Sequence, residues 1–179
     1  MKPMIVCYSH TKNNERLAKK LQDGLGCEIL DINEKKKRKT ISILLDFMFN
    51  RSAKLTGYQF GNHNQDTLII VAPVWGGKLA SPMRVFLEKE KDKIHRYFFI
   101  SLCNGGVGQK AKIAEELTTL AQREPEAVAE LWINRLLPEE QQNKIKHTFH
   151  YRVNEKDLDR FEEEISEFIE LVRGSGQAD

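Results

Sequence analysis

The chain contains one six-residue stretch that is almost wholly apolar and rich in β-branched side chains, Thr67-Leu68-Ile69-Ile70-Val71-Ala72. A continuous apolar run of this length, without the alternation of a half-exposed strand, is typical of a parallel strand that helices cover on both faces. β-Branched residues favour the extended backbone because their χ1 angle is restricted. We therefore expect residues 67–72 to form the central strand of a sheet.

Other short apolar runs lie on both sides of this stretch and alternate with segments of helical period. The pattern predicts strands at residues 4–8, 27–32, 97–102 and 127–133. It predicts helices at residues 17–25, 40–50, 111–121 and 158–172, and one more that begins with Ser81 as N-cap and Pro82 as the first helical residue. Strands that alternate with helices imply a parallel sheet joined by right-handed crossovers, so the predicted fold class is α/β, a three-layer αβα sandwich.

Two segments do not fit this alternation. Residues 52–66 are rich in Gly, Asn and polar side chains and are expected to form a long loop. Residues 134–154 are polar with scattered aromatics, and their pattern does not decide between a strand, a helix and a lid. We expect one domain over residues 1–173, followed by a frayed tail at 174–179.

The composition narrows the classes of function. A formal charge of +2 over 179 residues gives no reason to expect nucleic acid or an acidic membrane surface, and the basic run at residues 35–39 is expected to be solvated. No apolar stretch approaches the roughly 18 residues that cross a bilayer. The three cysteines, Cys7, Cys27 and Cys103, have no metal-ligand spacing and fit reduced thiols, with Cys7 and Cys27 in the core. A cytoplasmic protein is expected.

Ligands of parallel α/β sheets bind beyond the carboxyl ends of the strands, so the loops that follow the first, third and fourth predicted strands matter most. The first of these loops leads directly into a helix and reads Ser9-His10-Thr11-Lys12-Asn13-Asn14. Free N–H groups at the helix N-terminus attract anions, and the hydroxyl and amide side chains can add hydrogen bonds to phosphate oxygens. The same residue types are also the favoured helix caps, so the loop by itself supports either interpretation.

The other two loops combine glycines with an aromatic or a thiol. One reads Pro73-Val74-Trp75-Gly76-Gly77-Lys78, and the other reads Cys103-Asn104-Gly105-Gly106-Val107-Gly108. Trp75 is able to stack on a planar heteroaromatic ring or to pack against a neighbouring helix. In both loops the glycines allow a backbone to approach a ligand closely. Gly76 and Gly77 also allow a peptide to turn over beside a ligand, and the glycines at 105–108 could equally serve a tight turn. Their spacing does not match a dinucleotide or nucleotide-triphosphate loop.

Taken in order, these three loops resemble those of the flavodoxin family, in particular its branch of short flavodoxin-like reductases. The resemblance spans roughly residues 4–133 and implies a five-stranded sheet of order 2-1-3-4-5. It implies that FMN is the cofactor, that Ser9, His10, Thr11, Lys12, Asn13 and Asn14 bind its phosphate, and that two further segments frame the isoalloxazine ring. These are Pro73, Val74, Trp75, Gly76 and Gly77, and Cys103, Asn104, Gly105 and Gly106.

The first loop departs from the family pattern at two positions. Lys12 stands where glycine is usual, and Asn14 stands where threonine is usual. Lysine lacks the freedom of glycine at positive φ, whereas its charge near a phosphate offsets part of that loss.

Trp132, in the last predicted strand, is expected to belong to the core.

The resemblance implies redox chemistry supplied by FMN, without a protein acid or base. An electron carrier would meet a redox partner protein, whereas a small reductase would use NAD(P)H and an acceptor such as a quinone, with residues 134–154 or 51–66 forming the pocket wall. The sequence does not decide whether the protein forms a homodimer. The second hypothesis is a flavodoxin-fold binding module that has lost its flavin. The five histidines form no cluster with carboxylates, so a metal hydrolase finds little support.

Overall fold

The structure, a computed structural model, describes residues 3–35, 53–60 and 67–175. The helix predicted at residues 40–50 lies outside these ranges. So do most of the basic run that begins at Lys35, the middle of the loop predicted at 52–66, and the end of the predicted tail.

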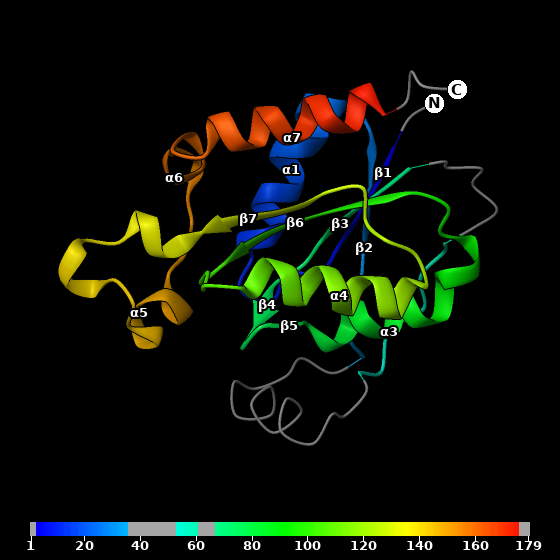
Figure 1. Ribbon diagram of the computed structural model, residues 1–179, viewed down its shortest axis with the longest axis horizontal. Coiled ribbons are helices and arrows are strands. Elements are labelled where there is room, and N and C mark those ends of the chain that lie inside the picture. The colour runs from blue at the N-terminus through cyan, green and yellow to red at the C-terminus, as the bar shows by residue number, and fades with distance from the viewer. Residues whose placement is uncertain (1–2, 36–52, 61–66, 176–179) are drawn as a thin grey trace.

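Five parallel strands form one sheet in the order β2-β1-β3-β6-β7 (Figure 1). The strands are β1 (Met4–Cys7), β2 (Glu28–Asp31), β3 (Leu68–Val71), β6 (Tyr97–Cys103) and β7 (Val128–Trp132). Counted along the five predicted strands, this order is the 2-1-3-4-5 that the resemblance implied. The apolar stretch at residues 67–72 supplies β3, the central strand, and all four of its residues are buried.

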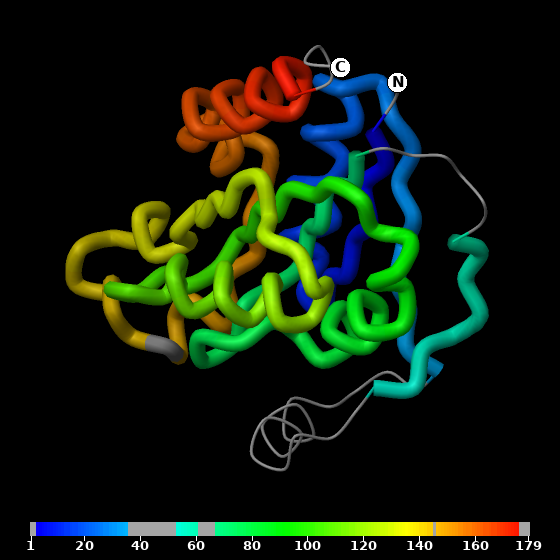
Figure 2. Tube along the Cα trace, turned by 45° about the vertical axis from the view of Figure 1, so that its right-hand side comes forward, coloured from blue at the N-terminus to red at the C-terminus, as the bar shows by residue number. Residues whose placement is uncertain are grey.

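Helices cover both faces of the sheet, because alternate side chains of each central strand point to opposite faces. One face packs against α1 (Asn13–Leu25) and α7 (Glu162–Gly174), with Ile69 and Val71 of β3 in that cluster. The other face packs against α3 (Ser81–Glu90) and α4 (Gln109–Ala121), with Leu68 and Ile70 of β3 in that cluster. Figures 1 and 2 show the two helical layers on either side of the sheet, which confirms the αβα sandwich.

The segment after β3 is a hairpin, which we had not predicted from the sequence. Strands β4 (Val74–Trp75) and β5 (Lys78–Leu79) pair antiparallel across Gly76 and Gly77. Both glycines have positive φ, 55° at Gly76 and 79° at Gly77. A two-residue turn with two positive φ values matches the twist of the flanking strands and favours glycine. The two glycines therefore form the turn of the hairpin, independently of any contact with a ligand.

Two predicted helix boundaries differ from the structure. Helix α3 has Ala80 as its N-cap, and Ser81 is already helical; the Ser81 hydroxyl instead accepts a hydrogen bond from the N–H of Ala53 at 3.1 Å. The predicted last helix is two helices, α6 (Glu155–Asp159) and α7, which are separated by Arg160 and Phe161. The apolar stripe continues across that break because both helices cover the same face of the sheet.

Short helices occupy the segment that the sequence left undecided. They are η2 (Ile133–Leu136), η3 (Glu139–Gln141) and α5 (Ile145–His150), followed by an extended stretch up to Asn154. A further short helix, η1 (Lys91–Lys93), precedes β6. In Figure 1, α5 lies beyond the carboxyl ends of the strands, on the side of the β4–β5 hairpin. Within the described ranges no helix has the length and apolar character that crossing a bilayer requires.

Candidate functional site

The predicted site residues follow the carboxyl ends of β1, β3 and β6, which lie side by side in the sheet. The register pairs Cys7 with Val71 and Val71 with Ile100, so β1 and β3 end level while β6 continues for three more residues. Parallel strands bring the loops after them to one edge, as expected from the sequence. The candidate site is this carboxyl edge.

The first loop turns into α1 through a left-handed residue. Lys12 is the N-cap of the helix, with φ 70° and ψ −1°, and its carbonyl accepts the first helical hydrogen bond from Arg16 N–H. A non-glycine residue in this conformation costs roughly 1–2 kcal/mol. The backbone thus keeps the shape for which the family pattern uses glycine, and the first N–H groups of α1, which have no partner within a helix, open toward the loop.

The side chains of Asn13 and Asn14 do not face the loop. Both are buried, and the Asn14 amide exchanges two hydrogen bonds with the backbone of Leu102 in β6, at 3.1 Å to its carbonyl and 2.9 Å from its N–H. The Asn13 amide donates to the carbonyl of Tyr151 at 3.0 Å and accepts from the N–H of Val153 at 3.1 Å. These amides join α1 to β6 and to the segment after α5, so only the backbone N–H groups of the two residues remain for an anion. Their expected phosphate-binding role is revised accordingly.

Ser9 carries a hydroxyl without a hydrogen-bond partner among the described residues. Its Oγ has almost no contact with solvent. A buried hydroxyl in this state costs about 1–3 kcal/mol relative to a bonded one. The Ser9 hydroxyl is therefore available to form a hydrogen bond with a ligand oxygen. Thr11, the other hydroxyl residue of this loop, is half-buried.

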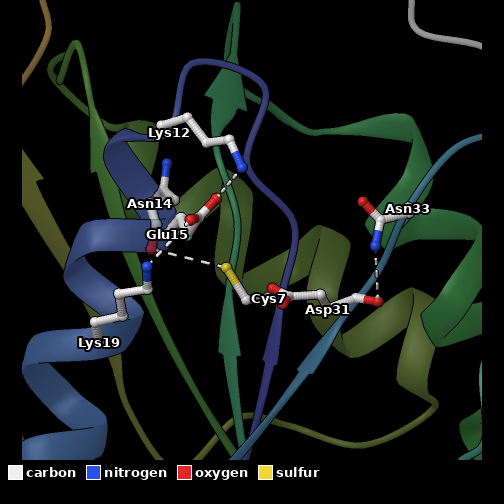
Figure 3. Close-up of polar contacts among 7 residues, drawn as sticks. All are labelled: Cys7, Lys12, Asn14, Glu15, Lys19, Asp31 and Asn33. Atoms are coloured by element: carbon white, nitrogen blue, oxygen red, sulfur yellow. Dashed lines mark hydrogen bonds and ion pairs between the residues drawn. The ribbon is translucent and has the colours of Figure 1, made fainter.

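The Lys12 ammonium pairs with a carboxylate of its own helix. It contacts Glu15, which also pairs with Lys19 at 3.4 Å, and Figure 3 shows this row of charges along the start of α1. The hydrogen bond and charge of Glu15 raise the pKa of Lys12, and the same hydrogen bond is the main cause that lowers the pKa of Glu15. We expected the charge of Lys12 to offset part of the cost of replacing glycine at this position. That charge is partly neutralised by Glu15.

Asp31, at the end of β2, is a further carboxylate beside this row. Figure 3 shows its side chain directed toward Cys7 of β1. Burial, and then the charge of Glu15, raise the pKa of Asp31. Burial is also the main cause that raises the pKa of the Cys7 thiol far above its usual range, and Cys7 lies in the core as expected. A thiol with a raised pKa stays protonated and is a poor nucleophile.

Trp75 connects the β4–β5 hairpin to the first loop. Its indole is half-buried and meets the ring of Tyr8 edge to face at 6.3 Å and the ring of His10 at 6.0 Å. The Tyr8 hydroxyl donates to Glu34 at 2.6 Å. Burial lowers the pKa of His10, the charge of Glu34 opposes this, and the charge of Arg152 adds to it. Trp75 packs on aromatic residues of the first loop and still exposes part of its ring at the edge.

The loop after β6 rests on an indole. Gly105 has φ 79°, and a Cβ added there would lie 2.3 Å from Cδ2 of Trp132. Trp132 is half-buried, and its Nε1 donates to Glu130 at 3.3 Å. It thus borders the loop, which the expectation of a plain core residue did not include. Gly106 on one side of Gly105 and Asn104 on the other are exposed.

Three predicted site residues have side chains in the core. Pro73, Val74 and Cys103 are all buried. Burial raises the pKa of Cys103 to about 12, and its sulfur accepts a hydrogen bond from Gln109 at 3.4 Å. These three residues can meet a ligand only through their backbones, whereas Trp75, the hairpin glycines, Asn104 and Gly106 reach the surface of the edge.

Sequence reasoning missed Arg152, and nothing local in the sequence marks it. It lies in the undecided segment, about 140 residues from the first loop, and the hydrogen bonds of Asn13 hold its neighbours Tyr151 and Val153 at the start of α1. The described part of the chain has no group of His, Cys, Asp or Glu side chains arranged to hold a metal. What this edge offers is N–H groups, hydroxyls, an exposed indole edge and glycine backbone.

Solved structures share this architecture. A flavoprotein from Lactobacillus acidophilus in complex with FMN aligns with a TM-score of 0.57 at 18% sequence identity, over 72% of this chain and 92% of that one. A protein assigned as a flavoprotein from Bacteroides eggerthii gives 0.62 at 14% identity, over 92% and 98%. One from Bacteroides uniformis gives 0.61 at 14%, over 74% and 90%. Neither a protein-family model nor a curated protein sequence matches the chain. The likeness establishes the flavodoxin-like fold.

Proposed function

We propose that this chain is an FMN-binding redox protein whose cofactor occupies the carboxyl edge of the sheet. The observation that carries the proposal is the first loop, where a left-handed Lys12 opens the N-terminus of α1 beside the unpartnered hydroxyl of Ser9. A phosphate would satisfy both, because it accepts hydrogen bonds from N–H and O–H groups and favours the positive end of a helix. The L. acidophilus flavoprotein of the same fold binds FMN.

The chain would hold the flavin by its two other loops. The hairpin turn at Gly76 and Gly77 holds Trp75 after β3, and Asn104 and Gly106 are exposed after the neighbouring strand β6. Aromatic stacking on the ring and hydrogen bonds to its polar rim would orient it. FMN supplies the electron chemistry when bound, so the protein needs no acid or base of its own.

Two uses of such a cofactor are compatible with the edge. An electron carrier passes electrons to a partner protein, whereas a reductase binds NAD(P)H and a small acceptor such as a quinone. The short helices between β7 and α6 favour the reductase, because α5 lies beyond the carboxyl ends of the strands and offers a wall for a second ligand (Figure 1). Anaerobic mixing of the FMN-loaded protein with NADH and, separately, with NADPH decides between them, since only a reductase bleaches the flavin absorption directly with one of the two.

A spectroscopic titration tests the cofactor. The chain has two tryptophans, so Trp132→Phe leaves Trp75 as the only indole. FMN should quench the emission of this variant, and Trp75→Ala should weaken FMN binding by about 1–3 kcal/mol, the size of a stacking interaction. Urea unfolding without FMN separates a packing loss from a binding loss.

The outcomes discriminate between the hypotheses. If FAD or NAD binds much more tightly than FMN, the interpretation of the first loop as a site for one terminal phosphate is wrong. If no flavin binds to the wild-type protein, the proposed function is wrong and the second hypothesis, a flavodoxin-fold binding module without a flavin, takes its place. If Trp75→Ala loses stability but keeps FMN affinity, the indole is a packing residue and the ring lies elsewhere.

A further inference from the structure

The segment between α5 and α6 is fixed to the first loop by one buried side chain. The Asn13 amide, 3% exposed, bonds the carbonyl of Tyr151 and the N–H of Val153. These two groups flank residue 152 on both sides. A buried amide that satisfies one acceptor and one donor in this way is costly to break, because each group would be left unpaired. The backbone of Arg152 is therefore held close to the start of α1.

Arg152 carries a charge that no carboxylate of the described residues neutralises. Its guanidinium donates to two backbone carbonyls, Tyr151 at 3.2 Å and Phe149 at 3.5 Å. The side chain is exposed, and residues 141–154 contain no Asp or Glu, although they contain three basic residues and two histidines. A guanidinium has five N–H donors, so most of its capacity is open to a ligand.

The charge of Arg152 reaches the first loop. It contributes to the lowered pKa of His10, which stands between Ser9 and Thr11 in the sequence. The Lys12 ammonium, in contrast, is paired with Glu15. Of these two cations, Arg152 is the one that pairs with no carboxylate of residues 3–35, 53–60 and 67–175.

We propose that Arg152, positioned by Asn13, is a phosphate-binding residue that closes the first loop over the FMN phosphate; this rests on the proposed function. A guanidinium binds phosphate through two parallel N–H donors, which gives direction as well as charge. It would supply the positive charge that the loop lacks because Lys12 is paired with Glu15. The phosphate would then lie between the N-terminus of α1, the Ser9 hydroxyl and Arg152.

The test compares FMN with riboflavin, which has the same ring and no phosphate. Both are titrated by flavin fluorescence into the wild-type protein, Arg152→Gln, and the control Lys91→Gln, which removes the same charge on η1 before β6, at the opposite end of the sheet. Arg152→Gln should weaken FMN binding about tenfold to 100-fold, the range for a charge-assisted hydrogen bond. Riboflavin binding should stay within about twofold, and Lys91→Gln should behave as wild type. The salt dependence of FMN binding should also decrease in Arg152→Gln.

Other results overturn the inference. If wild type binds FMN and Arg152→Gln binds it equally well, Arg152 is not at the phosphate, although the proposed function stands. If Arg152→Gln weakens riboflavin as much as FMN, its effect is on the fold of the edge. Wild-type protein that binds neither flavin removes the proposed function and this inference together. Arg152→Lys provides a second variant. It keeps the charge but lacks the two parallel N–H donors of the guanidinium, so it should recover only part of the FMN affinity.

Discussion

The loop after β1 and the loop after β6 each reach the carboxyl edge through a residue with positive φ, but they are stabilised in different ways. In the first, Lys12 adopts φ 70° with a full side chain, and neighbouring amides anchor the helix behind it. In the second, Gly105 adopts φ 79°, and the indole of Trp132 occupies the space where a side chain would begin. The first loop is fixed by hydrogen bonds and tolerates a lysine. The second is fixed by packing and accepts no Cβ at all.

If hydrogen bonds fix the first loop, removing the Asn14 amide should have the largest effect on stability. Asn14→Ala leaves the N–H and the carbonyl of Leu102 unpaired in a buried strand. We expect a loss of about 4 kcal/mol in the free energy of unfolding, since each such group costs about 1–3 kcal/mol. Urea unfolding measures it, with the exposed Asn104→Ala as a control expected within about 0.5 kcal/mol of wild type. Equal stability of the two variants would contradict this account of the loop.

If packing fixes the second loop, Gly105→Ala should destabilise the protein by about 3 kcal/mol, through overpacking against Trp132 and the cost of positive φ. The loop provides two controls. Gly106→Ala has free space and no positive φ, and Gly108→Ala has free space with φ 73°, so the second isolates the backbone term. Introduced into a Trp132→Ala background, Gly105→Ala should cost only the backbone part, because the indole that causes the overpacking is absent. If Gly105→Ala lowers the free energy of unfolding no more than Gly108→Ala does, the Trp132 indole must move to make room for the added Cβ.

Lys12→Gly tests whether the first loop is strained. Glycine relieves roughly 1–2 kcal/mol of left-handed strain. Against this stand the extra freedom of glycine in the unfolded chain, about 0.5–1 kcal/mol, and the lost exposed ion pair with Glu15, under about 1 kcal/mol. The three contributions nearly cancel, so we expect a net change between about −1 and +1.5 kcal/mol in the free energy of unfolding, and FMN binding that is unchanged or tighter. Lys12→Ala keeps the strain, loses the charge and should be less stable than wild type. A large loss of FMN affinity in Lys12→Gly would mean that the ammonium itself binds the phosphate.

The sequence predicts this fold well because the deciding signals are local. The apolar run at residues 67–72 and the helical stripe of α1 each follow from neighbouring side chains, and the parallel order then brings the loops to one edge. The site is predicted less completely. The residue types at Asn13 and Asn14 match phosphate binding and helix capping alike, and their partners, Leu102 and Tyr151, lie about 90 to 140 residues away. The hairpin at Gly76 and Gly77 had a local signal, two glycines between short apolar segments, that was interpreted only as access for a ligand.

The smallest effect expected is on the titration of His10, and it reports where the phosphate lies. Burial and the charge of Arg152 lower the pKa of His10, and Glu34 opposes them, so the folded chain binds fewer protons than the unfolded chain just below the ordinary value of 6.5. Its contribution to stability is therefore complete above pH 6.5 and is lost as the pH falls toward the folded-state pKa. His10→Gln should flatten this part of the profile in urea unfolding between pH 7.5 and pH 5.5. In an NMR titration of the imidazole, a phosphate dianion beside His10 stabilises the protonated ring and should raise its pKa. FMN should produce that rise and riboflavin should not. A pKa that responds equally to both flavins would place the ring, rather than the phosphate, next to His10, and the orientation of FMN across the two loops would have to be reversed.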